Sequence, residues 1–206
     1  MMHVRAHRSG TTIPAADAFS SDIVLITMSN PMGYAAALHF ARAGAIVAIN
    51  TPIWVSSERP PELSARIHTF DFAPDCHMSV RRIFDRIAGR LGPVSVLINN
   101  PVFDLNVGVD APELVQRPRN QAILDGVTVC ATEFVRQRRT AGVGGTIFNV
   151  VETSVYDGTD AVVTSDGRTG LLELTQALAD EWSDSGICVE AIEPGVFGPA
   201  SQQYMR

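Results

Sequence analysis

The chain has 206 residues, 46% hydrophobic and 18% charged, with a formal net charge of −6 at pH 7, which is typical of one globular domain. The negative charge argues against a nucleic-acid partner, and no apolar run reaches the roughly 20 residues that span a bilayer. Because the N-terminus also lacks the apolar centre of a signal peptide, we expect a soluble cytoplasmic protein with no membrane partner.

The lysine and cysteine contents limit the possible chemistry further. All 16 basic residues are arginine, which excludes a lysine nucleophile and a tyrosine activated by lysine. The three cysteines are far apart and odd in number, so Cys76, Cys130 and Cys188 predict neither a disulfide framework nor a metal site.

Apolar segments alternate between the strand and helix periods along most of the chain. Residues 1–21 show no sustained period, and we expect a flexible N-terminal arm there, followed by a single domain at 22–206. Short buried strands are predicted at 22–27, 45–50, 67–72, 97–100, 146–151 and 187–195, and helices at 34–43, 79–91, 119–138 and 164–182. This order predicts a Rossmann-like, doubly wound parallel sheet in an α/β fold of three layers, helices over strands over helices.

Two helix ends carry local signals. Ser79 is placed to cap the helix at 79–91, whose apolar face is Val80, Ile83, Phe84 and Ile87. The basic run at 136–139 falls at the C-terminal end of a helix, where cations favour the helix dipole, so we interpret it as structural.

Three motifs together resemble the short-chain dehydrogenase/reductase superfamily. They are the helix start Arg168-Thr169-Gly170-Leu171, the strand from Ile187 that ends in Pro194-Gly195, and the strand end Leu97-Ile98-Asn99-Asn100. The resemblance covers roughly residues 22–199 and implies the Rossmann-like fold. Members of the superfamily usually continue further, so we expect a C-terminally shortened domain with an open sheet edge suited to pairing.

The dinucleotide turn of this superfamily is altered in the chain. There it reads T-G-x-x-x-G-x-G, and its glycines let the backbone approach the pyrophosphate. Aligned on Ala43-Gly44-Ala45, the chain keeps Gly33 but has Thr27 and Pro31 at the other two glycine positions. Side chains crowd this approach, and proline also removes an N–H. We therefore expect no cofactor, with NAD(P) as the alternative.

Other positions of a vestigial nucleotide site follow from the same resemblance. Asp71 matches an aspartate that often touches the adenine ring, although an aspartate that ends a strand is commonly a turn former. Asn99 begins a loop that lies along the adenosine half of the cofactor, and Pro194 and Gly195 match residues that contact the carboxamide. In that loop Pro101 and Val102 replace an alanine and a glycine.

The catalytic motif of the superfamily is altered as well. It reads Y-x-x-x-K, and the tyrosine acts as acid or base while the lysine lowers its pKa. This chain has Thr164 and Arg168 at those positions, and threonine is too basic to ionise near neutral pH. The serine position falls on Val151 or Glu152, and the asparagine position falls on Leu124 or Asp125.

We predict a catalytic set of Arg168, Thr164, Ser154, Glu152 and Tyr156. Arg168 would anchor an anionic or carbonyl oxygen, and Thr164 and Ser154 would donate hydrogen bonds to it. Glu152 would accept the proton, with Asp166 or Tyr156 as the alternatives.

This arginine-containing pattern resembles the halohydrin dehalogenases, relatives that lost the nucleotide site and hold a halide in its place. The resemblance implies a cofactor-independent, lyase-type enzyme that abstracts a proton from a small molecule and expels a leaving group. Its pocket would lie near Thr27, Met32, Asn99 and Phe103.

Two other functions stay open. One is a non-catalytic partner or ligand-binding pseudoenzyme, and the other is a divergent NAD(P)-dependent oxidoreductase. In each case we expect a homo-oligomer or a hetero-oligomer with an active relative.

Overall fold

The computed structural model of the chain describes residues 18–28, 30–50, 61–101, 103, 113–151, 165–193 and 197; the side chains at 31, 61, 113–118, 165 and 166 lie outside this description.

The described residues form one six-stranded sheet. Its strands are β1 (Ile23–Ile26), β2 (Ile46–Asn50), β3 (Ile67–Phe70), β4 (Val96–Asn99), β5 (Gly145–Val150) and β6 (Ile187–Ile192). They lie in the order β3-β2-β1-β4-β5-β6, and every neighbouring pair is parallel. The strand order therefore reverses between β1 and β4, and such a switch point opens a crevice at the carboxyl ends of the strands.

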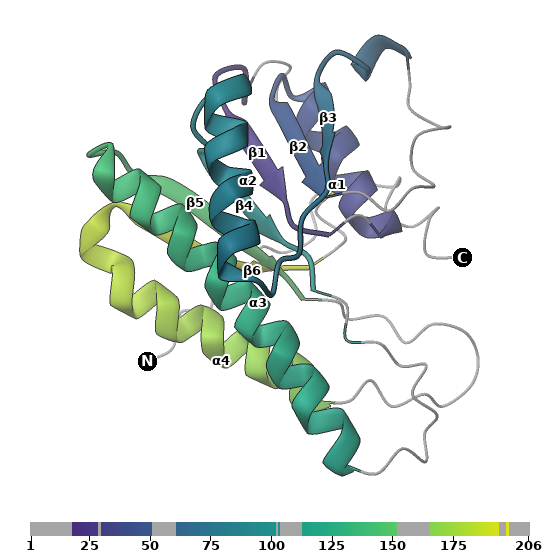
Figure 1. The fold of residues 1–206 in the computed structure, drawn as a ribbon, viewed down its shortest axis with the longest axis vertical. Helices are drawn as coiled ribbons and strands as arrows, with labels where there is room; N and C mark the ends of the chain where they lie inside the picture. The colour runs from purple at the N-terminus through teal and green to yellow at the C-terminus, as the bar shows by residue number, and fades with distance from the viewer. Residues whose placement is uncertain are drawn as a thin grey trace.

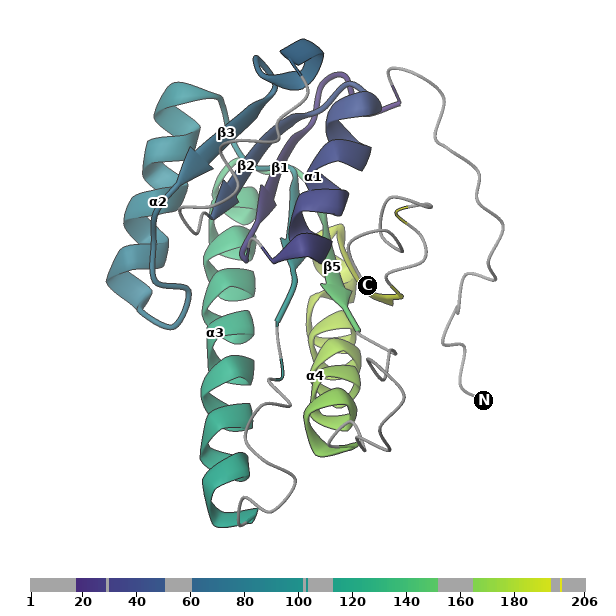
Figure 2. The same cartoon turned by 90° about the vertical axis from the view of Figure 1, so that its right-hand side faces the viewer.

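Helices cover both faces of this sheet, as Figures 1 and 2 show. They are α1 (Pro31–Arg42), α2 (His77–Arg90), α3 (Glu113–Thr140) and α4 (Ser165–Trp182), with short 3₁₀ turns at Pro61–Leu63 and Ser183–Ser185. Helix α1 lies on one face, and α2, α3 and α4 lie side by side on the other. The predicted Rossmann-like, three-layer α/β fold is confirmed.

The alternation of side chains along β1 explains why two helical layers are needed. Ile23 and Leu25 enter the apolar cluster under α2 and α3, whereas Val24 and Ile26 enter the cluster under α1. All four side chains are buried. A parallel strand covered on both faces reads as a continuous apolar run, and that is how this strand appears in the sequence.

The starts of two helices differ from the sequence predictions, and the basic run agrees with its prediction. Helix α1 begins at Pro31, earlier than predicted, because Asn30 caps it and proline suits its first turn. Helix α2 begins at His77, and the predicted cap Ser79 instead accepts a hydrogen bond from the N–H of Ala73 at 2.9 Å. The basic run is structural as predicted: Arg138, for example, donates to the carbonyl of Gly144 at 2.6 Å.

Among the described residues, no helix is long and apolar enough to cross a membrane.

Candidate functional site

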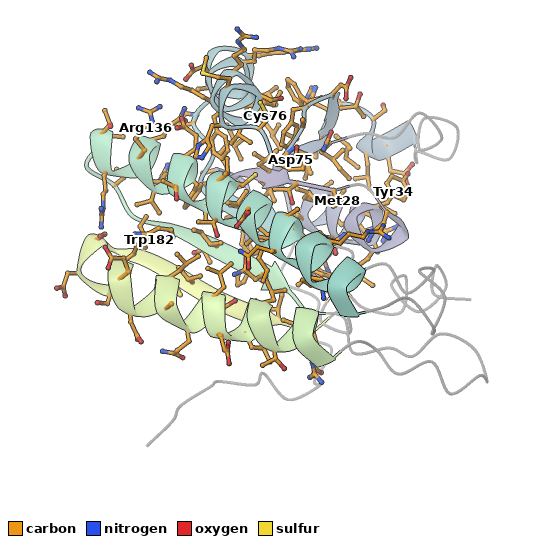
Figure 3. The ribbon with its side chains drawn as sticks, turned by 60° about the horizontal axis from the view of Figure 1, so that its bottom comes forward. Met28, Tyr34, Asp75, Cys76, Arg136 and Trp182 are labelled. Carbon is orange, nitrogen blue, oxygen red and sulfur yellow. The ribbon has the colours of Figure 1, made fainter. Side chains whose placement is uncertain are left out.

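A cavity of about 260 Å³ lies at the switch point between β1 and β4. Its walls come from the chain after β1, the loop between β3 and α2, the chain after β4, and one face of α3: Thr27, Met28, Pro74, Asp75, Pro101, Ala122, Ile123, Gly126 and Val127. Figure 3 shows Met28 and Asp75 near each other beside α3. The walls are mostly apolar, with the Asp75 carboxylate as their charged group among the residues described.

Helix α3 holds the β3–α2 loop close to itself. A side chain at Gly126 would begin 3.6 Å from the backbone of Pro74 and 3.7 Å from that of Asp75, so the loop passes within van der Waals distance. One turn later, the buried thiol of Cys130 points its sulfur to the carbonyl of Pro74 at 3.7 Å. Burial, and secondarily the charge of Asp75, raise the pKa of Cys130 to about 12. The thiol therefore stays protonated and donates to this carbonyl.

Asparagine side chains and backbone groups join the ends of the central strands by hydrogen bonds. Asn50, at the end of β2, donates to the carbonyls of Thr27 at 3.0 Å and Phe72 at 3.1 Å, and accepts from the N–H of Phe72 at 3.3 Å. The N–H of Asn100 donates to Oγ1 of Thr27 at 3.4 Å. The Thr27 hydroxyl, predicted to crowd a ligand, thus also bonds to the protein at the cavity wall.

The first turn of α1 is capped by Asn30. Its Oδ1 accepts from the N–H of Gly33 at 2.7 Å and from Nδ2 of Asn100 at 2.5 Å. Gly33 is required sterically, because a Cβ there would lie 2.0 Å from the carbonyl oxygen of Met28. The last glycine of the altered turn therefore keeps a role in close packing.

A second amide chain runs from β4 through β5 to α4. Asn99 donates from Nδ2 to Oδ1 of Asn149 at 2.9 Å, and Asn149 donates to Oγ1 of Thr175 at 2.8 Å. Thr175 in turn donates to the carbonyl of Leu171 at 2.6 Å. Asn99 is fully buried, and its Oδ1 has no hydrogen-bond partner. Such an atom costs free energy unless a ligand or a water meets it.

The start of α4 carries the predicted arginine. Arg168 is exposed, on the helical stripe that continues through buried Leu171 and Thr175. Next to it, Gly167 is buried, and a Cβ there would lie 2.5 Å from the ring of Phe103. The guanidinium therefore remains accessible, while the neighbouring turn packs against an aromatic side chain.

The superfamily's asparagine position has no amide in this chain. Leu124 is half-buried and packs in a small apolar cluster with Phe103 and Leu171. Asp125 is exposed and accepts from Gln121 at 2.8 Å. Neither residue provides a carboxamide at the start of α4.

The structure distributes the predicted site residues over several places. Thr27 lines the cavity, Gly33 lies at the start of α1, and Asp71 is exposed and outside the cavity lining. Met32 is buried with α1, so it lies across the sheet from the cluster that contains Phe103. Outside the described residues lie Glu152, Ser154, Tyr156, Thr164, Pro194 and Gly195, together with the side chain of Asp166.

Sequence reasoning overlooked four residues that shape this region: Asn30, Asp75, Gly126 and Cys130. Two of them carry a readable signal. Asparagine before proline is typical of a helix start, and a glycine inside a helical pattern often marks close backbone packing. Asp75 and Cys130 acquire their positions only when the β3–α2 loop folds against α3.

A model of the short chain dehydrogenase family matches residues 22–206. The chain belongs to this family. An uncharacterized oxidoreductase from Thermotoga maritima is 29% identical over 189 residues, which cover 86% of this chain and 72% of that protein. A glucose 1-dehydrogenase from Gluconobacter oxydans is 29% identical over 201 residues, covering 89% and 72% of the two chains.

Solved structures share the fold of this chain. ElxO with NADP bound superposes with a TM-score of 0.67 at 21% identity, over 84% of this chain and 72% of that one. A short chain dehydrogenase from Leptospira borgpetersenii with bound NAD+ also has a TM-score of 0.67, at 19% identity, over 84% and 70% of the two chains.

These comparisons contradict two sequence predictions. A cofactor-independent, lyase-type enzyme was the wrong expectation, because the relatives are named as an oxidoreductase and a dehydrogenase. The expectation of no cofactor was wrong for a similar reason, since proteins of this fold carry NADP or NAD+. The altered glycines do not remove the whole site, because the cavity beside α3 is built by other residues, among them Pro74, Gly126 and Val127. The halohydrin dehalogenase-like and pseudoenzyme descriptions receive no support from these proteins.

Proposed function

We propose that this chain is a divergent nicotinamide-dinucleotide-dependent oxidoreductase that acts on a small alcohol or carbonyl compound. The observation that carries the proposal is the cavity at the switch point between β1 and β4. Open α/β sheets bind ligands at this place, outside the carboxyl ends of their strands. The names of the relatives and the cofactors in structures of the same fold support it.

The cavity fits one end of a dinucleotide. Its volume of about 260 Å³ is below the roughly 300–1,000 Å³ of pockets that enclose a drug-sized ligand. Apolar walls from Pro101, Ile123 and Val127 suit a flat aromatic base, and the carboxylate of Asp75 suits an exocyclic amino group as donor. We therefore assign the adenine end of the cofactor to this cavity.

The end of β2 does not favour one form of the cofactor. An acidic residue here binds the 2′-hydroxyl of NAD in the dinucleotide fold. This chain has Asn50 at that end, and its side chain is already bonded to backbone groups of Thr27 and Phe72. Both NADH and NADPH must therefore be tested.

A bound nicotinamide would exchange a hydride with the substrate. The remaining tasks are orientation of the substrate and transfer of a proton. The exposed guanidinium of Arg168 is suited to hold a carbonyl or carboxylate oxygen, because arginine stays charged and donates in a planar fork. For the proton we retain Glu152 as the proposed carrier, with Ser154, Tyr156 and Thr164 as the other members of the set.

The test is calorimetric titration with NADH and NADPH, together with nicotinamide fluorescence. We expect binding by the wild type and at least tenfold weaker binding by Gly126→Leu, whose side chain would fill the cavity. The matched control is Gly89→Leu on α2, where an added Cβ meets no atom within 4 Å. Binding that is equal in all three proteins would place the cofactor elsewhere, and no binding at millimolar concentration would refute the proposal.

Turnover is the second arm of the test. Wild type and Arg168→Ala are assayed with simple sugars, alcohols and ketones by following nicotinamide absorbance. We expect Arg168→Ala to keep cofactor affinity and to lose at least tenfold in kcat/KM, about 1.4 kcal/mol. Equal turnover by the variant would remove Arg168 from the substrate site.

Three further expectations from the sequence remain proposals. The domain spans 22–206 after an N-terminal arm, the chain forms homo-oligomers or pairs with an active relative, and it works in the cytoplasm. Sedimentation of the purified chain, alone and with co-purified proteins, tests the second of these.

A further inference from the structure

We propose that Asn30 is a specificity-determining residue that shifts ligand recognition from the pyrophosphate to the adenosine end. The inference rests on the proposed function, since it concerns the same dinucleotide site. The start of α1 contributes little to binding, and the cavity beside α3 contributes most.

The first turn of α1 has few N–H donors left for a phosphate. A helix N-terminus normally attracts anions through its unpaired N–H groups. Here Pro31 has no N–H, and Gly33 donates to Oδ1 of Asn30 at 2.7 Å. Tyr34 donates to the carbonyl of Asn30 at 3.0 Å. Within the described part of the chain, Met32 is the one of the helix's first three residues whose N–H has no protein acceptor.

The cap is held in place by a second contact. Nδ2 of Asn100 donates to Oδ1 of Asn30 at 2.5 Å, and Asn100 itself is 3% exposed. If a phosphate displaced the Asn30 carboxamide from Gly33, this buried amide would lose its acceptor as well. A ligand must therefore break two existing hydrogen bonds before it can use the N–H of Gly33 and the Nδ2 of Asn100.

Two hydrogen-bond acceptors lie beside the first turn of α1. Besides Oδ1 of Asn30, the carbonyl oxygen of Met28 lies against Gly33, where a Cβ would be 2.0 Å away from it. These two carbonyl oxygens place partial negative charge beside the first turn of α1, where a helix N-terminus usually favours an anion.

The adenosine end has no such obstacle. The cavity is lined mostly by apolar side chains, and its Asp75 carboxylate can accept a hydrogen bond from an amino group. Removing the diphosphate from a ligand should consequently cost little affinity, whereas removing the base should abolish binding.

The experiment compares adenosine, ADP and NADH by calorimetric titration of the full chain. For the wild type we expect the dissociation constants of adenosine and ADP to agree within about threefold, and that of NADH to lie within about tenfold of them. This comparison needs no variant, so it remains decisive if a substitution prevents folding.

The variant is Asn30→Gly, because glycine is tolerated at a helix N-cap and frees the N–H of Gly33. We expect ADP and NADH to bind about tenfold more tightly, while adenosine affinity is unchanged. The matched control is Ser95→Ala, which removes the hydroxyl that bonds Ile23 at 3.0 Å and Asp22 at 2.7 Å before β4. It should alter none of the three affinities.

The outcomes separate this inference from the proposed function. If ADP and NADH bind the wild type at least 100-fold more tightly than adenosine, or Asn30→Gly brings no gain, the role of Asn30 is refuted while the oxidoreductase proposal stands. If none of the three ligands binds at millimolar concentration, both proposals are overturned.

Discussion

Gly126→Ala should make the protein more stable while weakening its binding of NADH. Glycine inside a helix costs roughly 0.5–1 kcal/mol relative to alanine, so the substitution should stabilise α3 by about that amount. The added Cβ would lie 3.6 Å from Pro74 and 3.7 Å from Asp75, which is ordinary van der Waals contact and causes no clash. For a chain of this length, about 1 kcal/mol corresponds to a rise of roughly 2–4 °C in Tm.

The same methyl group enters the wall of the cavity, and the ligand loses the space that it occupies. Gly89→Ala is the matched control, because it replaces an exposed helical glycine that has no atom within 4 Å of the new Cβ. We expect both variants to gain stability, measured by thermal unfolding, and only Gly126→Ala to lose affinity in a calorimetric titration. A drop in Tm for Gly126→Ala alone would show that the β3–α2 loop is packed too tightly, and unchanged affinity would refute the assignment of the cavity.

Three further substitutions test the electrostatics and the packing. Burial lowers the pKa of His39 below its ordinary 6.5, so the unfolded chain binds the proton first and stability should fall as the pH drops below about 6.5. Urea unfolding at pH 7.5 and 5.5 should show a smaller loss of unfolding free energy at the lower pH for His39→Gln than for the wild type. Burial and the neighbouring Glu190 raise the pKa of Cys188, so Glu190→Gln should speed alkylation of this thiol by iodoacetamide at pH 8, and an unchanged rate would exclude that coupling. Gly33→Ala places a Cβ 2.0 Å from the carbonyl of Met28 and should cost about 1–3 kcal/mol in chemical unfolding; a wild-type midpoint would contradict the tight turn.

Sequence periodicity was sufficient for the fold because each strand of the central sheet is covered on both faces. The run Ile23 to Ile26 needs burial on both sides, and only helical layers above and below a parallel sheet provide it. The apolar face of α2 was equally readable, and its four residues are buried: Val80, Ile83, Phe84 and Ile87. Helix starts were less predictable, because His77 begins α2 without a side-chain cap, which no local rule indicates.

The candidate site was less accessible to sequence reasoning. Thr27 and Pro31 stand at two glycine positions of the superfamily's turn, and the absence of a cofactor was predicted from this change. The cavity instead depends on the distance between α3 and the β3–α2 loop, which is set by Gly126 and by the thiol of Cys130. These residues are far from Thr27 in sequence, so their cooperation appears only in three dimensions.

The positions that differ from the superfamily's motifs lie in two separate places, beside the cavity and beside the start of α4. Beside the cavity, where Thr27 and Pro31 are altered, a hydrogen bond between the side chains of Asn100 and Asn30 holds the start of α1. Beside the start of α4, Leu124 lies in an apolar cluster with Phe103, and the exposed Arg168 stands where the resemblance to the superfamily implies a lysine. The two sides share few residues, so they can diverge independently. Ligand binding and turnover must consequently be measured separately, since retention of the first does not imply retention of the second.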